Sequence, residues 1–558
     1  MSTEDTNKVV VTLQKGVDVD AFMQEMNSVG SSSPHVPDRA VEIYNEKPES
    51  MRNVDFVMTR EEAQALKNDP RVLDARYGTK AENGIVKIRM ASTANMQMDR
   101  ASTWVASGNT DANWGLARVN STTNNITTGL TTPFAYTRNY TLTGNGADVV
   151  IMDSGIQADH PEWLAPDGVT SRFQRINWFA TGFPTGNVTG YANAYTDNNG
   201  HGTNVTSIAT GRTYGWASES NIYCINILGE YANGQPDLGA QMPVDLSINR
   251  MRAWHQAKTP TSTGFVRPTI MNNSWGYGIP VSYITQWRNV NYRGTSTSVS
   301  SYTSALSAYG IVSLTGYSSN DTIPTQVSST DADIQDAIDA GVIVMVSGGN
   351  DAYKMDVVGG TDYNNYITAD VQGYTETIYY QRGNSPASAY GSVTNRPIVV
   401  GAVSRASNVI VNQENKTNFS KTGPGVQVYA PGDYIAGACS TTSNLGSYPK
   451  VNYPTNSSFR SIKVSGTSQA SPQVAGWAAT IMAMRPWLNQ AQLTQYMNDV
   501  SVANVLNENS GGGTGYTNFY YLQGGTNRYM YNPFSGSTVT TATLGSDGTT
   551  PTVIRGQL

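Results

Sequence analysis

Long apolar runs, cysteines and charged residues are all scarce in this 558-residue chain, and each scarcity excludes a class of protein. No run reaches the roughly 18 apolar residues that a membrane-spanning helix requires. Two cysteines, Cys224 and Cys439, allow at most one disulfide, which excludes a small disulfide-stapled scaffold. Charged residues make up 14% of the chain and the net charge is −6, so no basic surface for nucleic acid is expected.

The N-terminal residues Met1–Thr6 are polar and acidic, without the basic and apolar segments of a secretory signal. We therefore expect cytoplasmic synthesis, no signal peptide and no membrane partner. The apolar content of 39% is ample for a core, and the length predicts two to four structural units.

Residues 8–78 have the pattern of a small separate unit. Short β-rich runs alternate with two helical segments, and the second helix starts with a capping box formed by Thr59 and Glu62. The order β-α-β-β-α-β predicts an antiparallel α+β, ferredoxin-like unit. Residues 79–112 are polar without firm periodicity, which predicts a linker.

From about 113 to 534 the pattern changes to continuous apolar strands with helical segments between them. This alternation predicts an α/β fold, a mainly parallel sheet covered by helices on both faces. Two stretches, about 279–330 and 356–383, have the character of surface insertions. The tail, 535–558, is rich in Gly, Thr and Ser and is expected to be irregular. The predicted strands are Asp148–Met152, Ile222–Leu228, Thr269–Asn272, Val342–Val346, Pro397–Val403 and Gln427–Tyr429.

Asp153 is the first of three reactive side chains that stand at the end of a regular element. The apolar run Val149–Met152 delivers its carboxylate to the C-terminal edge of the sheet, where α/β proteins bind ligands. Taken alone, the same pattern also fits an Asp that caps a loop.

His201 lies between two glycines where a helix is expected to begin. The positive end of the helix favours a neutral, basic imidazole, and the glycines permit close approach by a substrate. A turn histidine is the structural alternative, but none of the other three histidines has this setting.

Ser468 stands in the motif Ser465–Gly476, where Gly466 allows a tight turn and a helix of small residues follows. Pro472 is expected in the first turn of that helix. A hydroxyl at a helix start faces the positive helix end, where the backbone N–H of Ser468 can also hold an oxyanion. The same pattern fits a buried small-residue helix with a Ser cap, and the two interpretations are compatible.

Asn350 follows an apolar strand and a glycine turn, so its amide can donate to a developing oxyanion. An ordinary turn Asn is the alternative. The four motifs together make coincidence improbable, although each alone is weak.

The order Asp, His, Ser is one of three known for such a triad, and it is the order found in subtilisin. Over roughly 113–534 the chain resembles the subtilase superfamily and, within it, the proteinase K group. The segments that carry the resemblance, besides the four motifs, are Asn113–Val119, Asp159–Glu162, Gly211–Gly215, Asn272–Gly276, Asn418–Ser420, Ala430–Gly432 and Gly525–Arg528.

The resemblance implies a serine endopeptidase with Asp153, His201 and Ser468 as the catalytic triad and Asn350 in the oxyanion hole. It also implies that Ser274, Trp275 and Gly276 pair with the backbone of a peptide or protein substrate. Residues 8–78 resemble the subtilase propeptide, so the N-terminal unit is expected to inhibit the cleft intramolecularly until the chain is cleaved within 79–112.

The sequence departs from the family pattern at Asn204, Ser207 and Gln469, where the family usually has His, Gly and Met. Ser404 replaces a calcium-binding Asp of the proteinase K group, so that site is expected to be absent. No cofactor and no metal site are predicted, and structural calcium elsewhere stays open.

A second hypothesis is an inactive or latent structural or binding protein on a subtilase scaffold. The missing signal, the insertions and the Thr/Asn/Tyr-rich texture favour it, and that texture is familiar from virion proteins. A phage- or particle-associated protease would unite both hypotheses.

Overall fold

The computed structural model describes residues 6–47, 49–77, 87–90, 113–124, 142–185, 195–229, 241–262, 264–388, 395–405, 414–443, 445, 450–508 and 521–534. The expectations for the tail and for most of the linker lie outside these residues. No helix in the described part of the chain is long and apolar enough to cross a bilayer. Cys224 and Cys439 are both buried and unpaired.

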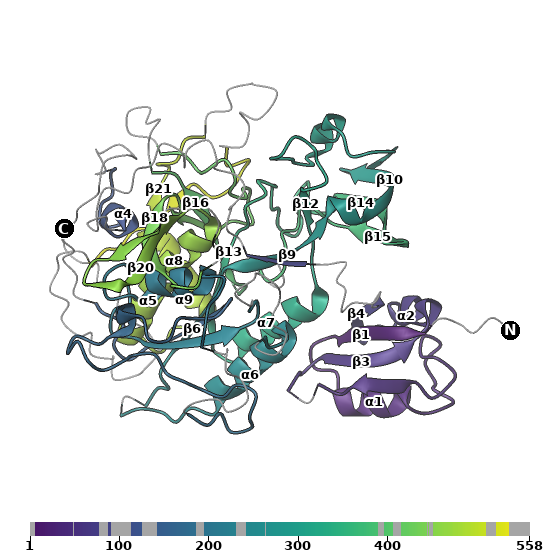
Figure 1. Ribbon diagram of the computed structural model, residues 1–558. Coiled ribbons are helices and arrows are strands. Elements are labelled where there is room, and N and C mark those ends of the chain that lie inside the picture. The colour runs from purple at the N-terminus through teal and green to yellow at the C-terminus, as the bar shows by residue number, and fades with distance from the viewer. Residues whose placement is uncertain are drawn as a thin grey trace.

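The N-terminal unit is an antiparallel sheet with two helices, drawn in purple in Figure 1. Its strands lie in the order β2-β3-β1-β4, and apolar side chains including Val9, Phe22, Phe56 and Leu66 form its own core. The helix α2 begins at the capping box of Thr59 and Glu62. The elements are β1 (Asn7–Leu13), α1 (Val19–Met26), β2 (Glu42–Asn45), β3 (Asn53–Met58), α2 (Arg60–Leu66) and β4 (Val72–Tyr77).

The main body is built on an eight-stranded sheet in the order β21-β22-β17-β16-β13-β8-β6-β7. All described pairs from β7 across to β22 are parallel, and only the short β21 is antiparallel. The mainly parallel sheet confirms the predicted α/β class. The strands are β6 (Asp148–Asp153), β7 (Asn221–Asn226), β8 (Thr269–Asn273), β13 (Ile343–Ser347), β16 (Ile398–Val403), β17 (Val428–Pro431), β21 (Val502–Ala503) and β22 (Arg528–Tyr529).

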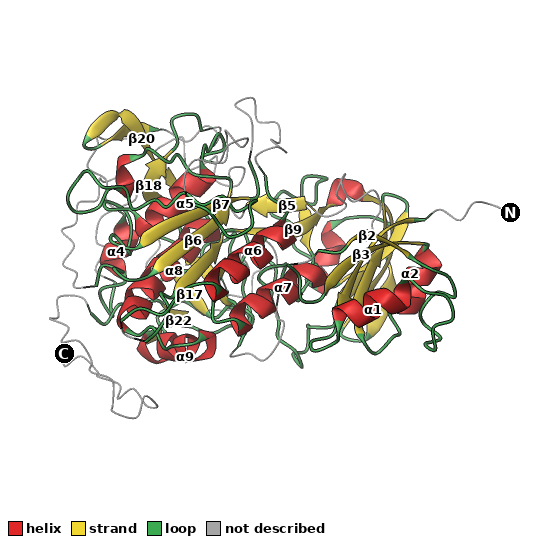
Figure 2. Cartoon of the chain, turned by 90° about the horizontal axis from the view of Figure 1, so that it is seen from below, coloured by secondary structure: helices red, strands yellow, loops and turns green. Residues whose placement is uncertain are grey.

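Helices cover this sheet on both faces (Figure 2). The long helix α8 packs across the central strands together with α5, while α6 and α7 pack against each other on the side of the N-terminal unit. Small side chains such as Ala475, Ala478 and Ala479 are fully buried, which lets α8 approach the sheet closely. The helices are α4 (Trp114–Arg118), α5 (His201–Thr210), α6 (Val244–Gln256), α7 (Ser328–Asp339), α8 (Thr467–Met484) and α9 (Gln490–Val500).

The two predicted insertions form one unit with a shared core, at the upper right of Figure 1. Its sheet has the order β11-β10-β14-β15, and its core draws on both stretches, for example Trp287, Val290, Ile367 and Ile378. A separate short sheet, β12-β9-β5, links this unit to the main body. The strands are β9 (Trp275–Pro280), β10 (Ile284–Tyr292), β11 (Thr295–Ser298), β12 (Thr322–Pro324), β14 (Tyr366–Val371) and β15 (Tyr374–Ile378).

A third small sheet, in the order β18-β20-β19, lies beside α5. Its strands are β18 (Ile435–Cys439), β19 (Val451–Tyr453) and β20 (Asn456–Val464). Its strand β18 packs against α5, the helix that begins with His201.

The N-terminal unit is attached to α6 and α7 by buried polar contacts. The Arg52 guanidinium donates from Nε to the Asp336 carboxylate at 3.0 Å and from Nη2 to the carbonyl of Ala332 at 2.7 Å. Lys47 Nζ lies 2.6 Å from Asp245 Oδ2 and 3.0 Å from Asp55 Oδ1. Because these charges are shielded from water, their loss would cost more than that of exposed pairs.

Candidate active site

Asp153 and His201 form a fully buried pair, although they lie 48 residues apart in the chain. Asp153 is the last residue of β6 and His201 is the first of α5, and His201 Nδ1 lies 2.7 Å from Asp153 Oδ1. This bond orients the imidazole ring, and the second ring nitrogen, Nε2, takes no part in it. Among the described residues, this buried Nε2 has no hydrogen-bond partner.

A second buried carboxylate, Asp197, organises the loop that precedes His201. Its oxygens accept from the Ser154 hydroxyl at 2.9 Å, from Gly200 N at 2.7 Å, and from both the backbone N and the hydroxyl of Thr203. Ser154 Oγ in turn accepts from Gly202 N at 2.9 Å. Burial raises the pKa of Asp197, while these donors counteract that shift. The network ties the end of β6 to the start of α5, so it fixes Asp153 and His201 relative to each other.

Ser468 is the second residue of α8 and forms a reciprocal pair with Ser274. The Ser468 hydroxyl donates to the Ser274 carbonyl at 3.0 Å, and the Ser274 hydroxyl donates to the Ser468 carbonyl at 3.0 Å. Pro472 explains the second bond, because it stands four residues after Ser468 and has no N–H to donate to that carbonyl. The expectation that Pro472 lies in the first turn is wrong, because α8 begins five residues earlier, at Thr467.

The starts of α5 and α8 are joined by the residues that depart from the family pattern. Gln469 Nε2 donates to Asn204 Oδ1 at 3.1 Å, and Asn204 Nδ2 donates to the carbonyl of Ala438 in β18 at 3.2 Å. Ser207 Oγ accepts from Ala438 N at 2.8 Å. The three departures therefore form one buried polar cluster, which holds the helix of Ser468 beside the helix of His201.

Asn350 follows β13 and is anchored by the residue that precedes Ser468. Its Oδ1 accepts from Thr467 N and from Thr467 Oγ1, both at 2.9 Å. Because the oxygen is engaged on that side, the amide nitrogen occupies the opposite edge of the group.

The strand β9, which begins at Trp275, is already paired on both edges. One edge is antiparallel to β12, and the other is antiparallel to β5 (Lys87–Met90), with Arg89 opposite Gly276 and Met90 opposite Trp275. Within the predicted linker 79–112, the structure has this short strand at Lys87–Met90, which the sequence analysis did not predict. The alternation Ile85–Met90, with apolar residues at every second position from Val86, was the available signal.

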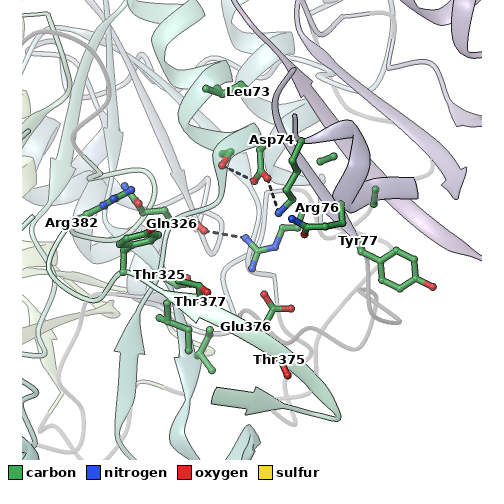
Figure 3. A pocket seen from close by; sticks show the side chains of 18 of the residues that line it. Leu73, Asp74, Arg76, Tyr77, Thr325, Gln326, Thr375, Glu376, Thr377 and Arg382 are labelled. Carbon is green, nitrogen blue, oxygen red and sulfur yellow. Dashed lines mark hydrogen bonds and ion pairs between the residues drawn. The ribbon is translucent and has the colours of Figure 1, made fainter. Parts of the chain in front are cut away.

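A cavity of about 740 Å³ lies between the N-terminal unit and the insertion, away from these residues (Figure 3). Arg76 spans it and donates from Nη1 to the Gln326 carbonyl at 3.0 Å, and Asp74 accepts from the Ser328 hydroxyl at 2.8 Å. Asp153, His201 and Ser468 do not line it. Within the described ranges, no three His, Cys, Asp or Glu residues are grouped so that they could hold a metal ion.

The structure thus pairs Asp153 with His201 and Ser468 with Ser274, at the starts of two helices that pack on a mainly parallel sheet. The sequence model of the subtilase family matches residues 144–520, and the chain belongs to this family.

The curated relatives are fungal proteases of moderate similarity. A subtilisin-like protease of Coccidioides posadasii is 25% identical over 430 residues, 73% of this chain and 62% of the relative. Proteinase R of Parengyodontium album is 26% identical over 374 residues, 67% of this chain and 61% of the relative. The chain thus spans about three fifths of the length of these relatives.

Solved structures also match. A cold-adapted subtilisin-like serine proteinase is 20% identical, with 77% of this chain and 100% of that chain covered and a TM-score of 0.43. Fervidolysin from Fervidobacterium pennivorans is 16% identical, with 94% of this chain and 60% of that chain covered and a TM-score of 0.46.

Proposed function

We propose that this protein is a serine endopeptidase that is synthesised as an autoinhibited precursor. The observation that carries the proposal is the buried 2.7 Å Asp153–His201 pair, whose second ring nitrogen is left unpartnered within the described structure. A buried imidazole whose Nδ1 is held by a carboxylate can act as a general base, because its Nε2 can accept a proton from a hydroxyl.

In the proposed reaction, the Ser468 hydroxyl turns from the Ser274 carbonyl to His201 Nε2 and attacks the substrate carbonyl. His201 takes the proton and gives it to the leaving amine, which leaves an acyl-enzyme on Ser468, while Asp153 stabilises the imidazolium. Water then attacks the acyl group with His201 as base, which releases the acid product and restores the Ser468 hydroxyl. The Asn350 amide and the Ser468 N–H hold the oxyanion, each worth roughly 10²–10³ in rate. The positive start of α8 supports the same charge.

Reaction with a fluorophosphonate probe tests this function. The full chain, or the product that it forms on storage, should be labelled at Ser468 and at no other serine, because only an activated hydroxyl attacks the probe. Prior denaturation serves as the control and should remove the labelling. A native chain that is never labelled would favour the alternative of an inactive scaffold, including one that associates with a particle.

Autoinhibition is supported by the occupied edge of β9. A peptide substrate is proposed to bind by adding an antiparallel strand to β9, and β5 of the same chain pairs with β9 in this antiparallel manner. Because β5 runs antiparallel to β9, its last residue, Met90, lies opposite Trp275. Trp275 directly follows Ser274, whose carbonyl is 3.0 Å from the Ser468 hydroxyl.

Self-cleavage is therefore predicted within a few residues after Met90. Intact-mass measurement of the purified chain over time should show an N-terminal product that ends between about 90 and 94 and a complementary large fragment. The Ser468→Ala chain should stay intact under the same conditions. Cleavage confined to sites far from this segment would contradict the assignment of β5 to the cleft.

Release of the cleaved N-terminal unit is predicted to depend on pH through Asp333. Asp333 Oδ1 accepts from Asn53 Nδ2 at 2.9 Å and from Ser50 Oγ at 3.2 Å, both in the N-terminal unit. Burial, with the neighbouring Asp245 charge, raises the pKa of Asp333 to about 7. Release of the N-terminal unit exposes Asp333 to water, which lowers its pKa toward the ordinary Asp value, although Lys47 of that unit opposes the raised pKa in the docked state. The protonated form therefore favours the docked state, and this preference is lost as the pH rises through about 7.

The dissociation constant of the cleaved unit is expected to rise about tenfold or more between pH 5 and pH 7. Analytical gel filtration of the processed chain at a series of pH values measures it. In Asp333→Asn the dissociation constant should change much less with pH. An equally steep change with pH in that variant would show that Asp333 is not the titrating group.

A further inference from the structure

The space beside Ser468 is bounded by two glycine-containing segments. One is Ser274–Gly276, whose first carbonyl is 3.0 Å from the Ser468 hydroxyl, and the other is Gly348–Asn350, anchored through the bond from Thr467 N to Asn350 Oδ1. Their strands, β9 and β13, belong to different sheets and contact each other. Under the proposed function, we place the side chain of the substrate residue that supplies the attacked carbonyl next to these two segments.

The Asn384 side chain lies between Gly276 of the first segment and Gly349 of the second. It follows the insertion, it is only 7% exposed, and Tyr277 N donates to the neighbouring Ser385 carbonyl at 3.0 Å, which fixes the segment against β9. A Cβ placed on Gly276 would lie 1.9 Å from Asn384 Nδ2, and one on Gly349 would lie 3.5 Å from Asn384 Oδ1. The Asn384 amide therefore lies between Gly276 and Gly349 and is close to both.

A buried ion pair holds Asn384 in place. Lys421 Nζ donates to Asn384 Oδ1 at 3.1 Å and lies 2.7 Å from Asp351 Oδ2. The Lys421 side chain is fully buried, and the Asp351 side chain is 24% exposed. Because the positive and negative charges are paired, these two side chains offer no net charge that would select an acidic or a basic side chain.

We propose that Asn384, held by Lys421 and Asp351, limits the substrate residue before the cleaved bond to small side chains such as Gly, Ala and Ser. The inference rests on the proposed function and names the substrate class of the same site. A large side chain would have to displace an amide that is fixed on one side by the ion pair and on the other by Gly276. The chain's own sequence fits, because Ala91-Ser92-Thr93-Ala94 follows β5 directly.

Peptide hydrolysis by the full chain, in the form that it reaches after purification, tests the proposal. Peptides that differ only in the residue before the cleaved bond, Ala or Phe, are compared in wild type, Asn384→Ala and Asn384→Asp. In wild type kcat/KM should favour Ala by at least about tenfold. Asn384→Ala should shrink this ratio by about tenfold or more, whereas Asn384→Asp, which keeps the volume, should retain it.

The outcomes separate this inference from the proposed function. Equal or better hydrolysis of the Phe peptide by wild type, or a ratio that Asn384→Ala leaves unchanged, would overturn the role of Asn384 alone. Absence of both hydrolysis and fluorophosphonate labelling in wild type would overturn the protease itself. If Asn384→Ala does not fold, judged by circular dichroism, Asn384→Ser removes most of the volume and keeps a polar group, and the same ratio decides.

Discussion

Ser468→Ala is expected to lower kcat for peptide hydrolysis by at least about 10⁴-fold with little change in KM, since the variant lacks the attacking oxygen. The loss should not come from unfolding. The Ser468 hydroxyl donates a single hydrogen bond, to the Ser274 carbonyl, and the reverse bond from the Ser274 hydroxyl to the Ser468 carbonyl does not involve the deleted atom. Progress curves with a chromogenic peptide, together with thermal unfolding, measure both effects.

Ser471→Ala is the matched control for this prediction. Ser471 lies one turn along α8, is equally buried, and donates to Asn272 Oδ1 at 2.7 Å. Its removal should lower the unfolding temperature, because a buried acceptor loses its donor, and should leave most of the hydrolysis rate. A Ser468→Ala chain that hydrolyses peptides as fast as Ser471→Ala would refute the assignment of the nucleophile.

Asp153→Asn is expected to lower kcat by about 10⁴-fold while the fold is kept. The substituted side chain would present an amide in the same volume, and an amide N–H facing His201 Nδ1 would favour the tautomer that carries its proton on Nε2. That ring could not accept the Ser468 proton. The substitution also removes the negative charge that stabilises the imidazolium, only 2.7 Å away in the wild type.

The control for Asp153→Asn is Asp159→Asn, at an exposed position in the same loop region. It makes the same chemical change without touching His201, so hydrolysis should stay near the wild-type rate. Fluorophosphonate labelling should slow in Asp153→Asn but not in Asp159→Asn. Equal rates in the two variants would mean that the Asp153–His201 bond has no part in the chemistry.

Local patterns allowed most of the elements to be predicted. The capping box of Thr59 and Glu62, the buried run Val149–Met152 and the small residues of α8 each depend on neighbours in the chain, so the sequence indicates them directly. The motifs around Asp153, His201 and Ser468 were visible for the same reason. The strand β5 was not predicted, because its alternation of apolar and charged residues is very short and the strand depends on its partner β9, which lies almost 200 residues later.

Several hydrogen bonds and packing contacts around Ser468 and His201 join residues that lie far apart in the sequence. Asn204 and Gln469 each depart from the family pattern, and only the packing of α5 against α8 shows that they bond to each other. Asn384 carried no motif, because its importance lies in its position between Gly276 and Gly349.

The sequence by itself determined which reactive groups this protein carries and the class of fold that presents them, because strand and helix periodicity and the turns around each reactive residue are local properties of the chain. The tertiary structure alone decided that the Asp153 carboxylate meets the His201 ring, that a strand of the same chain lies along β9, and that the Asn384 amide lies between Gly276 and Gly349. These depend on distances between segments that the folded core sets.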